Sequence, residues 1–199
     1  MPRISLTDLM DVAISSGVPK ASKATQILSR PEYQPQFDFY KQLREAILNM
    51  HQTSSPKSIL DKVKLQLTDK KKQTNYPDAI KGYKKWLGNK KPKWFKPPRA
   101  DLSVAGIDVT VNPELGLNIN DNRHIVKLYF KPVKLNKRRS DVITCAMEDA
   151  LRSISKPNDI MTVVDVRQGK HFVGSGASPK LSAMLGAELA YIAYIWSTI

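Results

Sequence analysis

Residues 106–131 of the chain read GIDVTVNPELGLNINDNRHIVKLYFK, and this stretch decides the fold class. Apolar and polar residues alternate in three short runs, 107–111, 115–119 and 125–131. Because the side chains of a β-strand point alternately to its two faces, the two-residue period predicts three strands with one apolar face each. The polar cluster at 120–123 favours a tight turn between the last two, since Asn and Asp tolerate positive φ. We therefore expect a three-stranded antiparallel meander.

Helical periodicity surrounds these strands. Apolar residues recur every three to four positions in five segments before residue 90: 7–16, 22–30, 37–52, 57–71 and 76–87. After the strands, a helix is expected at 141–154 and a buried strand at 160–173. Ser178 and Pro179 are typical of a helix start, and an apolar segment follows them to the C-terminus. The pattern predicts an α+β protein with a helical N-terminal part.

The expected domain organisation follows from this change of period. Residues 1–80 form a helical N-terminal part, and residues 101–199 form the part that contains the sheet. Between them, residues 81–100 are basic, aromatic and rich in proline, and Pro92, Pro97 and Pro98 exclude regular structure there. We expect this segment to be a linker.

The composition indicates a folded protein with an anionic partner. The 199 residues are 41% hydrophobic and 25% charged, which is ordinary for one folded domain, but the net charge is +14. Residues 1–100 contain 20 Lys and Arg and 8 Asp and Glu, so most of the excess charge lies in this half. A polyanion is the expected partner, with nucleic acid favoured over an anionic membrane.

The cysteine count and the apolar segments bear on the cellular location. With Cys145 alone, neither an intramolecular disulfide nor a zinc site built on several cysteines can form. Acidic residues interrupt the N-terminal apolar stretch, and no segment approaches the roughly 18 apolar residues of a membrane span. We expect a cytoplasmic protein that does not bind a membrane.

The basic aromatic segment is the strongest functional signal. Lysines neutralise phosphates and aromatic rings stack on unpaired bases, so their interleaving favours nucleic-acid binding. The alternative is that the rings pack under the helices while the lysines extend into solvent. The first two helices also allow a helix-turn-helix interpretation. Including the basic start of the later helix, the predicted binding residues are Lys84, Lys85, Trp86, Lys90, Lys91, Lys93, Trp94, Lys96, Arg99, Lys137, Arg138 and Arg139.

The polar face of the predicted sheet is a candidate for metal chemistry. Asp108, Glu114 and Lys127 alternate with the apolar residues, so carboxylates and a lysine from neighbouring strands meet on one face. Asp108 and Glu114 could hold a metal ion between them. Equally, the face could carry cross-strand ion pairs in contact with solvent.

The order of elements over residues 36–173 resembles the core of the PD-(D/E)XK, restriction-endonuclease-like nucleases. The resemblance implies a Mg²⁺ site in which Asp108 or Glu114 is the first acid and Lys127 the lysine, with bound water attacking a phosphodiester. Ile125 stands where that family has its second acid, two residues before the lysine. We therefore expect cleavage to be absent or weak, and the nuclease is the second hypothesis after nucleic-acid binding.

The C-terminal helix suggests a further interaction. It is apolar on nearly all sides, so it is expected in the core, with a homodimer or a partner protein as the alternative cover. A third hypothesis for the whole chain is an interaction subunit whose positive charge recruits an acidic protein.

Overall fold

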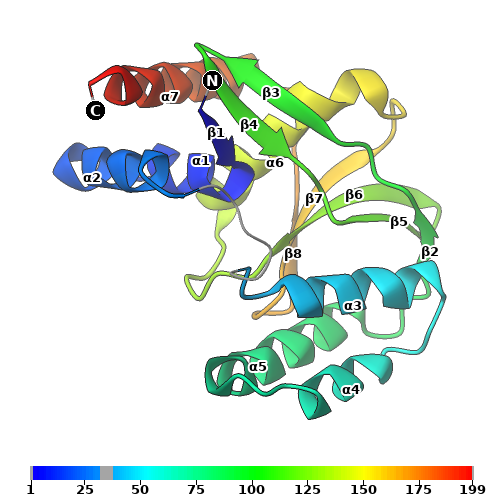
Figure 1. Ribbon diagram of the computed structural model, residues 1–199. Coiled ribbons are helices and arrows are strands. Elements are labelled where there is room, and N and C mark those ends of the chain that lie inside the picture. Colours follow the sequence, from blue (N-terminus) through cyan, green and yellow to red (C-terminus); the bar gives the residue numbers. More distant parts are fainter. Residues whose placement is uncertain (1, 32–37, 199) are drawn as a thin grey trace.

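A five-stranded sheet forms the middle layer of the protein (Figure 1). The computed structural model describes residues 2–31 and 38–198, and it confirms the α+β class. The strand order is β2 (Lys93–Phe95), β5 (Leu115–Ile119), β6 (Asn122–Tyr129), β7 (Ile160–Asp165) and β8 (Lys170–Val173). Strands β6 and β7 are parallel, and the other neighbours are antiparallel.

The predicted hairpin is present between β5 and β6. Ile119 pairs with Asn122, and the two turn residues Asn120 and Asp121 have φ values of 50° and 64°. Positive φ at both central positions matches the right-handed twist of the flanking strands. The Asn-Asp pair thus sets the register that places Lys127 and its neighbours.

The first predicted strand does not join the other two in a single meander. It forms β4 (Ile107–Val111), which lies in a second sheet between β1 (Arg3–Ser5), parallel to it, and β3 (Ala100–Val104), antiparallel to it. Pro113 lacks the N–H group needed to continue a ladder, and the chain crosses there to the five-stranded sheet. The segment 160–173, expected as one strand, is the hairpin β7–β8, with Gly169 at φ 64° in its turn.

A helix forms in each predicted helical segment, but the segment 57–71 is divided, since one helix ends at Leu65 and the next begins at Lys70. Ser5 and Asp8 make a capping box at α1 (Leu6–Ala13), and the Ser178 side chain caps α7 (Pro179–Ser197). The others are α2 (Gly17–Leu28), α3 (Lys41–Gln52), α4 (Ile59–Leu65), α5 (Lys70–Leu87), α6 (Lys137–Leu151) and a 3₁₀ turn, η2 (Arg152–Ile154). Residues 37 and 199, at the ends of two expected helices, lie outside the described residues.

Two hydrophobic cores lie on opposite faces of the five-stranded sheet. Val126 and Leu128 of β6 pack on one face with α3, α4 and α5. Ile125 and Tyr129 pack on the other face with α6, and this core continues to the three-stranded sheet, α1, α2 and α7. Figure 1 shows α3–α5 below the sheet and the remaining helices above it.

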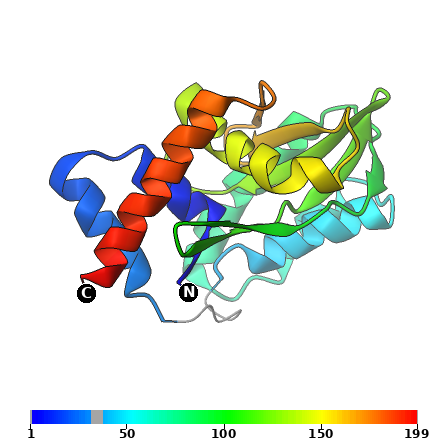
Figure 2. The same cartoon turned by 90° about the horizontal axis from the view of Figure 1, so that it is seen from above.

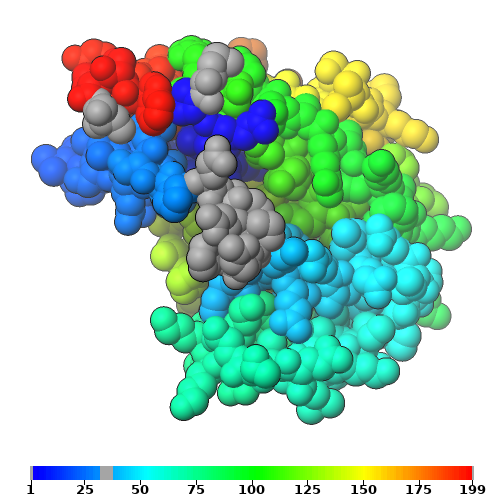
Figure 3. All heavy atoms as spheres, viewed as in Figure 1, coloured from blue at the N-terminus to red at the C-terminus, as the bar shows by residue number. Residues whose placement is uncertain are grey.

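The observed packing does not separate the chain at residues 81–100. Residues 81–87 are the end of α5, and residues 93–95 are strand β2, so the expected linker is largely regular structure. The N-terminal helices α1 and α2 pack against the C-terminal helix α7, as Figures 2 and 3 show. The helical segment before the sheet therefore contributes to two different cores.

Helix α7 buries only one side. Leu185, Leu189 and Ile192 are buried, whereas Tyr194 and Trp196 are exposed. The helix is therefore buried in the core on this side, as expected. That a second copy or another protein covers its outer side stays a prediction. Among the described residues, no helix combines the length and apolar character that a membrane crossing needs.

A buried histidine makes stability depend on pH. His51 shares a 2.6 Å hydrogen bond with the Tyr83 hydroxyl under the helical layer, and burial lowers the pKa of His51 to about 4. The pKa in the unfolded chain is about 6.5, so between these values the unfolded state binds more protons. The free energy of unfolding should fall by about 3 kcal/mol from this group as the pH falls from 6.5 to 4.

Denaturant unfolding of the wild type and of His51→Gln at several pH values measures this contribution. The wild-type protein should lose more stability than the variant across that window, because glutamine does not titrate. Parallel pH profiles for the two proteins would contradict the prediction.

Candidate nucleic-acid interface

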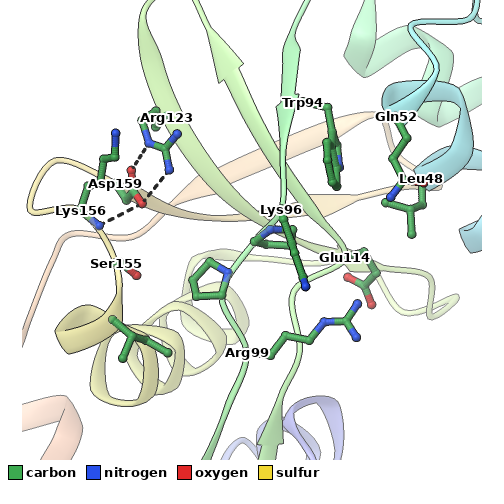
Figure 4. Close-up of a pocket in the computed structure, with 13 residues that line it drawn as sticks. Leu48, Gln52, Trp94, Lys96, Arg99, Glu114, Arg123, Ser155, Lys156 and Asp159 are labelled. Carbon is green, nitrogen blue, oxygen red and sulfur yellow. Dashed lines mark hydrogen bonds and ion pairs between the residues drawn. The ribbon is translucent and has the colours of Figure 1, made fainter.

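A hollow of about 1020 Å³ lies between α3, the chain that joins β2 to β3, the start of β6 and the segment after α6 (Figure 4). We call it the large hollow. Its walls combine apolar and charged side chains from segments far apart in the sequence. They are Leu48, Gln52, Trp94, Lys96, Pro97, Pro98, Arg99, Glu114, Arg123, Ile154, Ser155, Lys156 and Asp159.

One wall is the crossing from the five-stranded to the three-stranded sheet. Phe95 of β2 pairs with Gly116 of β5, and a Cβ at Gly116 would lie only 2.4 Å from the Phe95 carbonyl oxygen. Glycine is therefore needed for β2 to approach β5. After β2, the rings of Pro97 and Pro98 fix the φ angles of these two residues, and Pro97 also restricts the backbone of Lys96 before it. The backbone that carries Lys96 and Arg99 is thus fixed from both ends.

On the opposite wall, the Arg123 guanidinium contacts both the Phe95 ring and the Asp159 carboxylate. Arg123 Nε donates to Asp159 Oδ1 at 2.7 Å, and its guanidinium carbon lies 3.6 Å from the centre of the Phe95 ring. Asp159 is almost fully buried and also accepts a 3.2 Å hydrogen bond from the Lys156 backbone N–H. These contacts join β6, β2 and the segment after α6.

Arg152 fixes the backbone around Lys156. Its guanidinium forms two 2.8 Å hydrogen bonds with Glu148 and donates to the carbonyl oxygens of Lys156, Pro157 and Asp159 at 2.8–3.0 Å. The hydrogen bond with Glu148 is the main reason that the pKa of Arg152 is raised. The loop that carries Lys156 is held in place without a ligand.

The two acids of the large hollow are neutralised by cations of the protein. Glu114 accepts from Lys127 Nζ at 2.7 Å and from the Leu128 backbone N–H at 2.7 Å, while Asp159 is paired with Arg123. Lys96, Arg99 and Lys156 are exposed, and their side chains have no acidic partner among the residues described. The hollow therefore presents excess positive charge on partly apolar walls.

The structure places the predicted nucleic-acid-binding residues in different environments. Trp94, Lys96 and Arg99 line the large hollow together. Trp86 is only 4% exposed and packs in the core with α3–α5, so its ring cannot stack on a base. This corrects the prediction for Trp86: the helical period that placed it on α5 also turns it toward the sheet.

Several of the predicted lysines are already engaged. Lys84 forms an ion pair with Asp61, Lys90 donates to the Trp86 carbonyl oxygen, and Lys137 pairs with Asp141. Arg139 lines a second, smaller hollow. Four other exposed cations of the predicted set lie outside both hollows: Lys85, Lys91, Lys93 and Arg138. Among the described residues, no acidic side chain forms an ion pair with them.

The residues of the nuclease hypothesis are not assembled into one site. Glu114 and Lys127 are joined at 2.7 Å, but Asp108 lies in the three-stranded sheet and accepts a 2.6 Å hydrogen bond from Ser103. Within residues 2–31 and 38–198, no three His, Cys, Asp or Glu side chains are placed to hold a metal ion. The Glu114–Lys127 ion pair matches part of the other expectation for this face, but both side chains are nearly buried and not in contact with solvent as expected.

The sequence patterns do not indicate four further residues of the large hollow, Gln52, Arg123, Lys156 and Asp159. They lie on α3, β6 and the segment after α6, far from the basic segment along the chain. The Pro157-Asn158 break marks a turn beside Lys156, but no local pattern indicates which other segment that turn faces. Only the paired strands bring Arg123 and Asp159 next to Phe95.

Comparisons with protein-family models, with curated proteins and with solved structures found no match to this chain. The residues of the large hollow are therefore the basis of the proposed function.

The Glu114–Lys127 pair should be structural. Both side chains are nearly buried, at 12% and 10% exposed, so Glu114→Gln leaves the Lys127 ammonium without a counter-ion. We expect the variant to lose about 3 kcal/mol of unfolding free energy, measured by chemical denaturation. Asp101→Asn is the matched control, because it breaks the exposed pair with Arg3 and should cost less than about 1 kcal/mol.

A double variant separates this charge effect from a packing effect. Adding Lys127→Met to Glu114→Gln removes the unpaired buried charge and should restore part of the lost stability. Equal small losses in Glu114→Gln and Asp101→Asn would show that the pair is not important for the fold.

Proposed function

We propose that the protein binds single-stranded nucleic acid in the large hollow. The observation that carries the proposal is the set of three cations, Lys96, Arg99 and Lys156, around walls whose acids are already paired. Phosphate groups of the backbone are the natural partners of such cations, because binding releases the counter-ions condensed on the nucleic acid.

The apolar part of the walls supports a single strand over a duplex. Leu48, Trp94, Pro97, Pro98 and Ile154 line the hollow beside the cations. Bases present their faces to apolar and aromatic side chains only when they are unstacked, as in single strands. In Figure 4, Lys96 and Arg99 lie below Trp94 in the view, and the Arg123–Asp159 pair lies to the left of all three. A strand in this hollow would meet both kinds of group at once.

The two other hypotheses have less support. The nuclease needs Asp108 beside Glu114, but the two carboxylates have different partners in different sheets. An acidic protein partner would satisfy the cations, but it gives no reason for a hollow with apolar walls. Measurements of cleavage and of competition by an acidic polymer distinguish these two hypotheses from nucleic-acid binding.

Neutralising the three cations should reduce the salt dependence of binding. In the triple variant Lys96→Gln, Arg99→Gln, Lys156→Gln, the slope of log K against log salt for a single-stranded oligonucleotide should flatten by about 2, since each phosphate contact contributes about 0.7. Fluorescence anisotropy at several salt concentrations measures this slope.

The matched control has the same change of net charge away from the hollow. Lys62→Gln, Lys81→Gln and Lys170→Gln alter three exposed lysines outside the large hollow, and this protein should keep most of the wild-type slope. Equal flattening in both triple variants would refute the assignment. Magnesium-dependent cleavage that disappears in both Asp108→Ala and Lys127→Ala, with folding intact, would establish the nuclease instead.

Trp94 should report directly on bound bases. Trp86 is buried and Trp196 lies on α7, so in a Trp196→Phe protein any quenching by ligand should come from Trp94. A single-stranded oligonucleotide should quench this emission more than a duplex of the same sequence. Trp94→Leu should weaken binding by about 1–3 kcal/mol, the usual contribution of one stacked ring.

The double variant Trp94→Phe, Trp196→Phe is the fluorescence control, and it should show no quenching. Tighter binding of the duplex, or quenching that persists in this control, would contradict the proposal. Competition by polyglutamate at the same ionic strength would favour the acidic protein partner.

A further inference from the structure

A second basic hollow lies at the other end of β6. It has a volume of about 260 Å³, and we call it the small hollow. Lys23 of α2, Lys131 just after β6 and Arg139 of α6 line it, together with Asp11 and Tyr129. We infer that the small hollow binds a phosphate group.

The pairing of its charges is incomplete. Lys131 forms an ion pair with Asp11. Lys23 and Arg139 are partly buried but have no acidic partner among the described residues. Elsewhere the protein pairs most partly buried cations with acids, as in Lys20–Glu188 and Arg152–Glu148.

Two cations that face one small space without a counter-ion repel each other. An anion in the small hollow would remove this repulsion and would partner both side chains.

The start of α6 gives a separate reason to expect an anion. Lys137, Arg138 and Arg139 occupy its first turn, and no acid does. The N-terminal end of a helix carries partial positive charge, so cations there are unfavourable and anions are favoured. Three consecutive basic side chains in the first turn do not favour the helix, so they point to a function other than helix stability.

The groups around the small hollow are held in place by the protein. The Tyr129 hydroxyl donates to the Val133 carbonyl oxygen at 2.8 Å, and the Asp165 carboxylate accepts from the Leu135 N–H at 2.9 Å. The Asn136 side chain accepts from the Arg139 N–H at 3.0 Å. The chain from β6 to α6 is therefore fixed, and the backbone that carries Arg139 is in place before an anion binds.

The phosphate has two chemically equivalent sources. Arg123 beside the large hollow and Tyr129 beside the small one are six residues apart on β6, which corresponds to about 20 Å. One source is a nucleic acid long enough to reach from the large hollow to the small one, and this source rests on the proposed function. The other is a separate molecule that carries its own phosphate group, which does not depend on that function.

Calorimetric titration with pyrophosphate tests the site itself. The wild-type protein should bind pyrophosphate, and Lys23→Gln, Arg139→Gln should bind it more than about tenfold more weakly, because two charge-assisted contacts are lost. The control Lys62→Gln, Lys81→Gln makes the same change of charge on the exposed surface and should bind pyrophosphate like the wild type. Retained binding in the first variant, or an equal loss in the control, would overturn the inference, as would tighter binding of malonate than of pyrophosphate.

Oligonucleotides of four and of twenty nucleotides then separate the two sources. If the phosphate belongs to the bound nucleic acid, Lys23→Gln, Arg139→Gln should weaken binding of the longer strand only. If it belongs to a separate molecule, the variant should lose pyrophosphate and keep both oligonucleotides. Because the large hollow is unchanged in this variant, failure of the phosphate site is distinguishable from failure of the proposed function.

Discussion

The position of β6 in the sheet is the constraint on which the other features depend. It pairs with β5 on one side and with β7 on the other, and residues 125–130 are buried. Its two faces belong to different cores, so the strand can neither slide nor turn without exposing one of them. Arg123 near its start and Tyr129 at its end are placed by the same register, and each borders one of the two hollows.

The charge of the chain cannot be balanced internally. There are 32 Lys and Arg and 18 Asp and Glu, so at least 14 cations lack an acid of their own. The acids nearest the hollows, Asp11, Glu114 and Asp159, are bound to Lys131, Lys127 and Arg123. Among the described residues, Lys96, Arg99 and Lys156 of the large hollow and Lys23 and Arg139 of the small one form no ion pair. This distribution gives the two hollows their character more than the overall net charge does.

The sequence predicts the elements better than their arrangement. Alternation identifies β4, β5 and β6, and the Asn-Asp turn identifies one hairpin, because both are local effects. One neighbour of β4 in its sheet is β1, which comes from the start of the chain. Periodicity does not indicate which distant segments pair. The residues of the large hollow also divide into those that the sequence indicates and those that only the fold brings together. Trp94, Lys96 and Arg99 belong to one basic segment, whereas Lys156 and Arg123 join them only through the pairing of β6 with β7.

The contacts of Phe95 connect the fold to the large hollow. Its ring lies against the Arg123 guanidinium, and its backbone pairs with Gly116 at the close approach of β2 to β5. Since Arg123 is also bound to Asp159, movement of β2 would disturb an ion pair with an almost fully buried carboxylate. Because such movement is energetically unfavourable, the two walls keep a fixed separation. A ligand that enters the hollow then does not have to order the backbone of these walls, which leaves more of the contact energy for binding.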